Sequence, residues 1–185
     1  YKYSTGDKGA ALQGARFCIR YADPDVSAQV WTLTTDATGT IKLDLPYTGT
    51  LIVEELEPPA GHLLREPAIW EVTVAKGENK RIDISNERKP GLIITKIDEA
   101  TGERLSGAVL RVTKQGAQEY QDVTTGADGT ATLTGLEPGW VTVVEQKAPN
   151  RYILDQTPHH IQLVPHETAE LTIKNRHKPS LKIVK

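Results

Sequence analysis

Two segments of this chain, 89 residues apart, share one pattern of residues: "SNERKPGLIITK" at 85–96 and "KNRHKPSLKIVK" at 174–185. Each has an Asn, a Lys-Pro pair and a final Lys at the same places, so Asn86 corresponds to Asn175 and Lys96 to Lys185. A period of this length is the size of a small domain, which predicts tandem copies of one folded unit. We assign the first repeat to residues 1–88 and the second to 89–178. Residues 179–185 are interpreted as the first strand of a truncated third repeat.

The two halves also match internally, and the matching segments have the character of β-strands. "LQGARFCI" at 12–19 aligns with "LSGAVLRV" at 105–112, and "LIVEELEPPAGH" at 51–62 aligns with "VTVVEQKAPNRY" at 141–152. These segments alternate apolar and polar residues, are rich in Val, Ile and Thr, and are separated by Gly, Pro, Asp and Asn. The pattern predicts an all-β chain of two tandem immunoglobulin-like antiparallel β-sandwich domains.

Composition narrows the class of partner. The 185 residues carry a formal net charge of −2 with both signs interspersed, which argues against nucleic acid or an anionic membrane as a partner. No apolar run approaches the roughly 20 residues that a membrane-spanning helix needs. The sequence contains no Met, even at position 1, and we expect it to be a piece of a longer protein.

Strand alternation places three polar residues of the second repeat on an inward face. Each closes an apolar row in which every second residue shares a side of the sheet: Leu92-Ile94-Lys96, Val141-Val143-Glu145 and Leu171-Ile173-Asn175. The first repeat has two matching rows: Leu51-Val53-Glu55 and Ile82-Ile84-Asn86. An amine, a carboxyl and an amide are costly to bury unless they satisfy one another, so the three side chains are expected to meet.

Such a trio has two interpretations. It can be an ordinary salt bridge and hydrogen bond at half-exposed strand ends. It can also be reactive, because a desolvated lysine loses its proton more readily and becomes a nucleophile, while a desolvated carboxyl keeps its proton longer. The lysine would then attack the asparagine amide and release ammonia while the glutamate shuttles protons, and proximity in a folded core would supply a high effective concentration.

The second repeat resembles a known family in the segments "KIDEATGERLSGAVL", "TTGADGTATLTGLEPGWVTVVEQKAPNRY" and "IKNRHKPSLKIVK". They are similar to the collagen-adhesin B-type repeats (Cna-B or SpaA-like, with a prealbumin-like fold) of Gram-positive surface proteins. The resemblance covers essentially the whole chain. It implies a spontaneous isopeptide bond between Lys96 and Asn175, assisted by Glu145.

The first repeat departs from the family pattern at its lysine. Glu55 and Asn86 match, but a gapless alignment places Tyr3 opposite the lysine of the second repeat. A one-residue insertion before Leu12, absorbed by a bulge or a longer turn, brings Lys2 to that position, and we prefer it to Lys8 in the neighbouring turn. Lys185 is expected to be unpaired, because the Asn of its own repeat is not in this sequence.

The remaining signals are weaker, and we expect no cofactor and no metal. Adjacent His159 and His160 point to opposite faces of a strand, which suits a metal poorly, and the "YADPDV" turn has too few ligands for calcium. Cys18 is alone and cannot form an internal disulfide. Three tryptophans at non-equivalent places are candidates for contacts with a ligand or for half-buried packing: Trp31, Trp70 and Trp140.

The sequence therefore favours structural stalk modules of a cell-surface adhesin or pilin, stabilised by intramolecular Lys–Asn bonds. The alternative is an adhesin module that binds a host protein or glycan. We expect no enzymatic turnover beyond the single autocatalytic event in each repeat. The expected partners are neighbouring repeats of the same chain, with a host ligand bound through other domains. The expected location is extracellular, with anchoring to the cell wall through a sorting signal that is not in this sequence.

Overall fold

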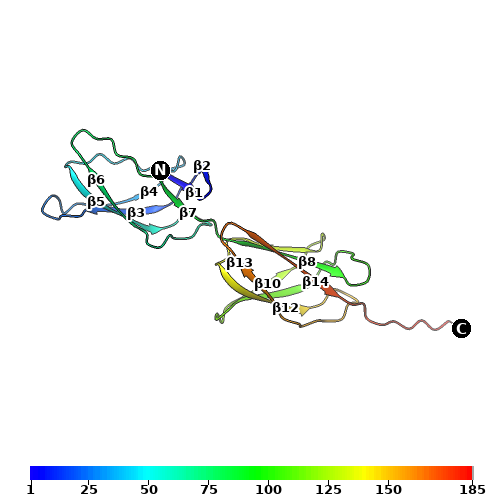
Figure 1. Ribbon diagram of the computed structural model, residues 1–185. Coiled ribbons are helices and arrows are strands. Elements are labelled where there is room, and N and C mark those ends of the chain that lie inside the picture. Colours follow the sequence, from blue (N-terminus) through cyan, green and yellow to red (C-terminus); the bar gives the residue numbers. More distant parts are fainter. Residues whose placement is uncertain (185) are drawn as a thin grey trace. The chain divides into compact units, whose positions relative to one another are not determined.

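The computed structural model describes residues 1–184 and confirms the all-β prediction, with strands joined by turns and coil (Figure 1). The chain divides into two compact units, the first spanning Tyr1–Arg88 and the second starting at Lys89. Each unit is a sandwich of two sheets, one of four strands and one of three. Within the described residues, no helix has the length and apolar character needed to cross a lipid bilayer.

The first unit contains seven strands among the described residues. Its larger sheet has the order β4-β3-β5-β6 and its smaller sheet the order β2-β1-β7. The bounds are β1 (Lys2–Ser4), β2 (Asp7–Ala11), β3 (Arg16–Tyr21), β4 (Val30–Thr34), β5 (Gly49–Glu57), β6 (Ile69–Val74) and β7 (Ile84–Asn86).

The second unit repeats the larger sheet as β10-β9-β12-β13 and has a more complete smaller sheet, β11-β8-β14. The bounds are β8 (Gly91–Asp98), β9 (Val109–Lys114), β10 (Tyr120–Thr124), β11 (Thr130–Leu133), β12 (Gly139–Lys147), β13 (His159–Leu163) and β14 (Thr168–Asn175).

The core of each unit lies between its two sheets and is built from the alternating apolar residues of the strands. In the second unit Leu92 and Ile94 of β8 are fully buried against residues of β12, including Val143. Burial of a Leu or Ile side chain contributes about 2 kcal/mol, so the β8 row is a main contributor to this small core. In the first unit Phe17 and Val53 occupy the corresponding core.

Most strand pairs are antiparallel, as expected, but the first and last strands of each unit pair in parallel. β8 lies beside β14 with Lys96 opposite Ile173, and β1 lies beside β7 with Lys2 opposite Ile84. In Figure 1 the green β8 and the orange-red β14 run side by side. Both pairs have the same register, because in each unit the Asn follows the residue opposite the lysine by two positions. Side chains two positions apart share a face, so the lysine and the Asn are diagonal neighbours in both units.

The smaller sheet of the first unit is shorter. Residues 40–43, which align with β11, and residues 79–83, which align with the first part of β14, are not in strands. In the second unit these two edges are joined by residues 92–95 of β8, which pair with both β11 and β14. In the first unit β1 includes Lys2, the residue that corresponds to Lys96, and pairs with β2 and β7.

Residues 179–184, interpreted from the sequence as the first strand of a third repeat, form no strand here. A strand is defined by its pairing, and these residues are paired with no other described segment. Leu181 and Ile183 are 86% and 84% exposed. The expected unpaired Lys185 lies outside the described residues.

Candidate functional site

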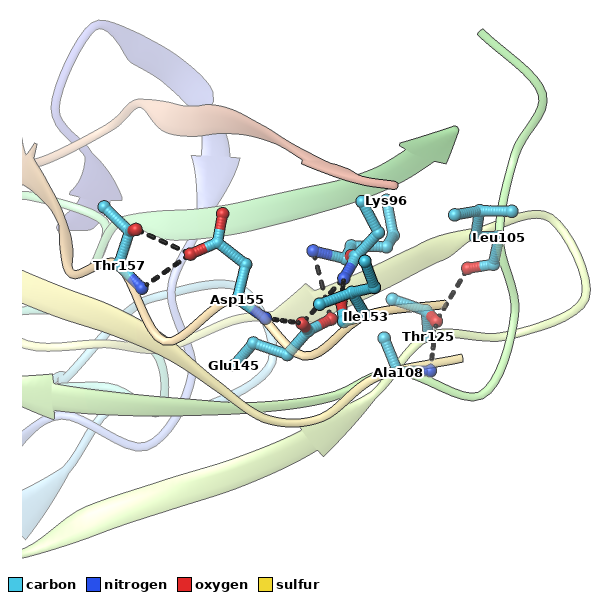
Figure 2. A network of polar contacts seen from close by, with 9 residues as sticks. Lys96, Leu105, Ala108, Thr125, Glu145, Ile153, Asp155 and Thr157 are labelled. Atoms are coloured by element: carbon cyan, nitrogen blue, oxygen red, sulfur yellow. Dashed lines mark hydrogen bonds and ion pairs between the residues drawn. The ribbon is translucent and has the colours of Figure 1, made fainter. Parts of the chain in front are cut away.

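The second unit brings Lys96, Glu145 and Asn175 together between its sheets. Lys96 and Asn175 come from the parallel strands β8 and β14, and Glu145 comes from β12 in the opposite sheet. Their side chains are at most 2% exposed. Lys96 Nζ lies 3.1 Å from Glu145 Oε1, and Asn175 Nδ2 donates to Glu145 Oε2 at 2.8 Å. Figure 2 shows Lys96 and Glu145 pointing toward each other at the centre of this network.

The first unit has the same arrangement with Lys2, Glu55 and Asn86. These three side chains are also at most 2% exposed. Lys2 Nζ lies 2.9 Å from both carboxylate oxygens of Glu55, and Asn86 Nδ2 donates to Glu55 Oε2 at 3.2 Å. The Lys2 amine also lies 5.3 Å from the centroid of the Phe17 ring, so an apolar wall lines this side of the site. The two units thus hold the same three groups in closely similar contacts.

Backbone hydrogen bonds show that Lys2 occupies the position of Lys96. The carbonyl of Lys2 accepts from the Leu12 amide, and that of Lys96 accepts from the Leu105 amide. The amides of the two lysines donate to Gly39 and Gly129, which are themselves equivalent.

The intervening loop is one residue longer in the first unit, as the sequence alignment required. The β1–β2 register shifts between Tyr3 and Ser4, and this irregularity accommodates the extra residue. Lys8, the alternative lysine, is exposed and lies over the Tyr3 ring. Tyr3 itself is only half-buried.

Burial changes the acid–base chemistry of the two lysines. Desolvation lowers the pKa of Lys2 and of Lys96 from the ordinary value, and the contact with the neighbouring glutamate offsets this only in part. A lowered amine pKa favours the neutral, nucleophilic form. A proton passed from the ammonium to the glutamate replaces a buried ion pair by two neutral groups, which removes the cost of keeping two charges from water.

The two sites differ in a neighbouring charge. In the second unit the backbone amide of Asp155 donates to Glu145 at 2.9 Å, and the negative charge of Asp155 raises the pKa of Lys96 slightly (Figure 2). The aligned residue of the first unit is Arg65, whose positive charge further lowers the pKa of Lys2. This one neighbouring charge therefore favours the neutral amine in the first unit and the charged amine in the second.

The asparagine amide groups are held in place through their nitrogens, which donate to the glutamate of each trio. Asn86 Nδ2 also donates to the carbonyl of Leu63 at 2.7 Å, and Asn175 Nδ2 donates to that of Ile153 at 2.6 Å. Within residues 1–184, the Oδ1 atoms of both asparagines are buried and accept no hydrogen bond. A buried acceptor left in this state costs about 1–3 kcal/mol. A protonated glutamate could donate to such an oxygen and polarise the carbonyl, which makes this oxygen the natural target of a proton shuttle.

The weaker signals of the sequence are the histidines, the aspartates of the "YADPDV" turn, Cys18 and the tryptophans. Among the described residues, no group of three His, Cys, Asp or Glu side chains is placed to hold a metal ion. His160 contacts Thr142 on the outer face of its sheet, and Asp23 accepts from the backbone of its own turn. Cys18 is half-buried. The three tryptophans have separate surroundings, since Trp31 and Trp70 pack on the core of the first unit and Trp140 is half-exposed.

Sequence reasoning missed a second buried polar cluster, beside the trio of the second unit. Asp98 accepts from the hydroxyl of Tyr152 at 2.9 Å and lies 3.2 Å from Nε2 of His177, whose ring contacts that of Tyr152 at a tilt. It also accepts from the amides of Ala100 and Thr101. These bonds hold the pKa of Asp98 below its usual value, while burial and the Asp98 contact raise the pKa of Tyr152 to about 12. The sequence could have indicated this cluster, because Asp98 lies two residues after Lys96 and therefore on the same inward face of the strand.

Comparison with known proteins agrees with the fold described above. The family model described as the SpaA prealbumin-like fold domain matches the chain twice, over residues 2–88 and 90–177. The resemblance seen in the sequence motifs is therefore confirmed. No curated protein sequence matches the chain.

Three solved structures illustrate the likeness. The shaft pilin SpaA from Lactobacillus rhamnosus GG is 18% identical with a TM-score of 0.60, and the match covers 98% of this chain and 97% of that one. The Bacillus anthracis TIE protein is 26% identical with a TM-score of 0.50, and the match covers 95% of this chain. A Streptococcal ancillary pilin is 26% identical over 97% of this chain, with a TM-score of 0.46. The chain spans 33% of the TIE protein and 61% of the ancillary pilin.

Proposed function

Since this chain belongs to the family of SpaA prealbumin-like fold domains, we propose that its two repeats are structural stalk modules of a Gram-positive surface adhesin or pilin. We propose further that each is closed by an internal isopeptide bond, Lys2–Asn86 in the first unit and Lys96–Asn175 in the second. The observation that carries the proposal is that both units bury the same trio, with the same register between the strands that hold its lysine and its asparagine. As part of a surface protein, the modules would lie outside the cell, and their neighbours would be further repeats of the parent chain.

The proposed reaction uses only the three side chains of each trio. The lysine ammonium gives a proton to the glutamate, and the resulting neutral amine attacks Cγ of the asparagine. The glutamic acid hydrogen-bonds to Oδ1, which carries the developing negative charge. It then passes its proton to the departing Nδ2 and takes a proton from the attacking nitrogen. A bond forms between lysine Nζ and asparagine Cγ, the Cγ–Nδ2 bond breaks, and one ammonia leaves. Because the folded core holds the reactants in contact, the step is effectively unimolecular.

The position of the bond suits a load-bearing module. Lysine and asparagine lie on the first and last strands of each unit, which pair in parallel. Tension applied to the two ends of a unit would shear these strands apart if hydrogen bonds alone held them. A covalent link between them would carry that load and would also restrict the unfolded chain.

Mass spectrometry of the denatured chain tests the proposal directly. We expect the intact mass to fall short of the sequence mass by two molecules of ammonia, with the two pairs of linked peptides recovered after digestion. Glu145→Gln should restore one ammonia and leave Lys96 and Asn175 unjoined. Lys2→Ala should restore the other, whereas the matched variant Lys8→Ala should change nothing beyond its own mass difference. An unmodified full mass for the parent chain would refute the proposal.

A further inference from the structure

The outer face of the larger sheet of the second unit carries a small open cavity. It has a volume of about 260 Å³ and is lined by Gln115, Trp140, Thr142 and His160. The residues between Trp140 and Glu145 on β12 alternate between buried and half-buried, so Trp140 and Thr142 share the outward side of that strand. His160 of β13 stands opposite Thr142, and the Gln115 amide donates to the Trp140 carbonyl. The cavity therefore lies on the side of the sheet that faces away from the trio.

The first unit repeats this sheet but not these side chains. The alignment places Thr50 where the second unit has Trp140, and Ala22 where it has Gln115. The backbone supports that equivalence, because the Ala22 amide donates to the Thr50 carbonyl as the Gln115 amide does to that of Trp140. A feature that the shared sandwich needs is expected in both units. Side chains found in one unit only therefore point to a role other than folding.

Trp140 gives the cavity a flat aromatic wall. Its side chain stays 48% exposed, so much of the indole contributes nothing to the core. The face of an aromatic ring carries partial negative charge and attracts groups with partial positive charge. The C–H groups on one face of a pyranose ring have this character and also form a flat apolar surface. The cavity is smaller than the roughly 300–1,000 Å³ of pockets for drug-sized ligands, a size that suits a single sugar ring.

The polar side chains beside the indole suit a ligand that has hydroxyl groups and no charge. The Gln115 amide offers donors and an acceptor, as a hydroxyl needs. Nδ1 of His160 lies 3.0 Å from Oγ1 of Thr142, which orients the imidazole and leaves Nε2 for a ligand. On the same face, Arg111 is already paired with Asp122 through two hydrogen bonds of 2.8 Å. An amide, a hydroxyl and an imidazole thus surround the aromatic wall.

We propose that this cavity is a carbohydrate-binding site for one ring of a neutral oligosaccharide. The sugar ring would stack on Trp140, while Gln115 and His160 would hydrogen-bond to its hydroxyls. A few well-placed polar groups around an apolar wall are the usual way in which a small-molecule site fixes the orientation of its ligand. Contact with a single ring in an open cavity predicts an affinity in the millimolar range. Binding should not require the isopeptide bonds, because the trio lies on the other side of the sheet.

The experiment is a titration of the intact chain with oligosaccharides, followed by NMR. The panel consists of neutral oligosaccharides that end in glucose, galactose, mannose, fucose, N-acetylglucosamine or N-acetylgalactosamine, with a sialylated oligosaccharide and an unstructured peptide for comparison. We expect at least one neutral member to shift the indole N–H signal of Trp140 at concentrations up to about 10 mM. The indole signals of Trp31 and Trp70, which pack on the core of the first unit, should stay in place as internal references. Glu145→Gln should bind the same sugar as the parent chain.

Two variants copy the first unit at the cavity. Trp140→Thr should weaken binding by about tenfold or more, because the sugar ring loses its stacking surface. Gln115→Ala should weaken it by about threefold or more, because one hydrogen bond is lost. Tyr47→Ser is the matched control, since it removes an exposed aromatic ring of the first unit, and it should bind as the parent does.

Two results would overturn the proposal. The first is a Trp140 indole signal that no neutral oligosaccharide moves at about 10 mM. If the sialylated oligosaccharide or the peptide moved it instead, the ligand would be an anionic glycan or a protein segment. The second is sugar binding that Trp140→Thr leaves unchanged, because another surface would then hold the sugar.

Discussion

Removing the proposed Lys96–Asn175 bond should destabilise the second unit by an amount that the structure allows us to calculate. The bond would close a loop of about 80 residues, and the loop-entropy relation gives about 4.5 kcal/mol of stabilisation for that length. For a domain of this size, a change of 1 kcal/mol moves the melting temperature by about 4–8 °C, so the expected loss is roughly 20 °C or more.

The variant must remove the bond without leaving a buried charge. Lys96→Met alone would leave the buried Glu145 carboxylate without its charged partner, and loss of one partner of a buried ion pair costs about 3–5 kcal/mol by itself. The double variant Lys96→Met and Glu145→Gln removes both charges. It keeps side chains of similar size and leaves an amide beside Asn175, so the entropic effect of the cross-link should dominate the change.

Differential scanning calorimetry of the intact two-unit chain is the appropriate assay, because the first unit serves as an internal reference. Its transition should stay in place while that of the second unit falls by roughly 20 °C, and intact mass should confirm the loss of a single link. A double variant that lacks one link and melts within about 5 °C of the parent would refute the loop-closure reasoning.

Two further predictions concern the surroundings of the trio. Tyr152→Phe should lower the melting temperature of the second unit by about 5 °C at neutral pH through loss of one buried hydrogen bond. Because the folded pKa of Tyr152 is raised to about 12, the parent's advantage over this variant should be full below pH 10 and disappear as the pH rises through 12. Gly129→Ala should destabilise the second unit by about 2 kcal/mol. Gly129 has φ of +70°, and an added Cβ would lie 2.7 Å from Arg104 Cβ, so the backbone beside Lys96 would have to move. The variant should show a lower melting temperature and changed amide chemical shifts in β8.

Much of the site could be predicted from sequence because strand alternation is a reliable guide to which face a side chain takes. The rows that end in Glu145 and Asn175 needed only that rule and the apolar residues before them. The lysine of the first repeat needed more, since a gapless alignment points to Tyr3. Its assignment to Lys2 required one extra residue between the lysine and Leu12, and a pattern of apolar and polar residues cannot show where such a residue is inserted. The hydrogen bond from the Leu12 amide to the Lys2 carbonyl, which matches that from Leu105 to Lys96, shows that the extra residue lies between Lys2 and Leu12.

Other features could not be predicted, because they depend on pairing between distant strands. Alternation does not say whether two strands run parallel, and the parallel β8–β14 pair is what makes Lys96 and Asn175 diagonal neighbours. The same limit applies to residues 40–43. Their sequence matches that of β11, but they form no strand, because a strand needs a paired neighbour as well as a suitable sequence. Tyr152 illustrates a third case, since its buried hydroxyl is satisfied only by Asp98 from a distant strand.

Strand β8 performs two tasks in the second unit. Its first half, Gly91–Thr95, joins β11 to β14 through backbone hydrogen bonds and packs Leu92 and Ile94 into the core. Its next residue, Lys96, reaches the glutamate and asparagine. The lysine therefore follows directly on a row of paired and buried residues, which holds its backbone in place before any covalent bond forms. A covalent bond at Lys96 would add a link to a strand that the sheet and the core already position, so its loss should lower the stability of the second unit without changing its fold.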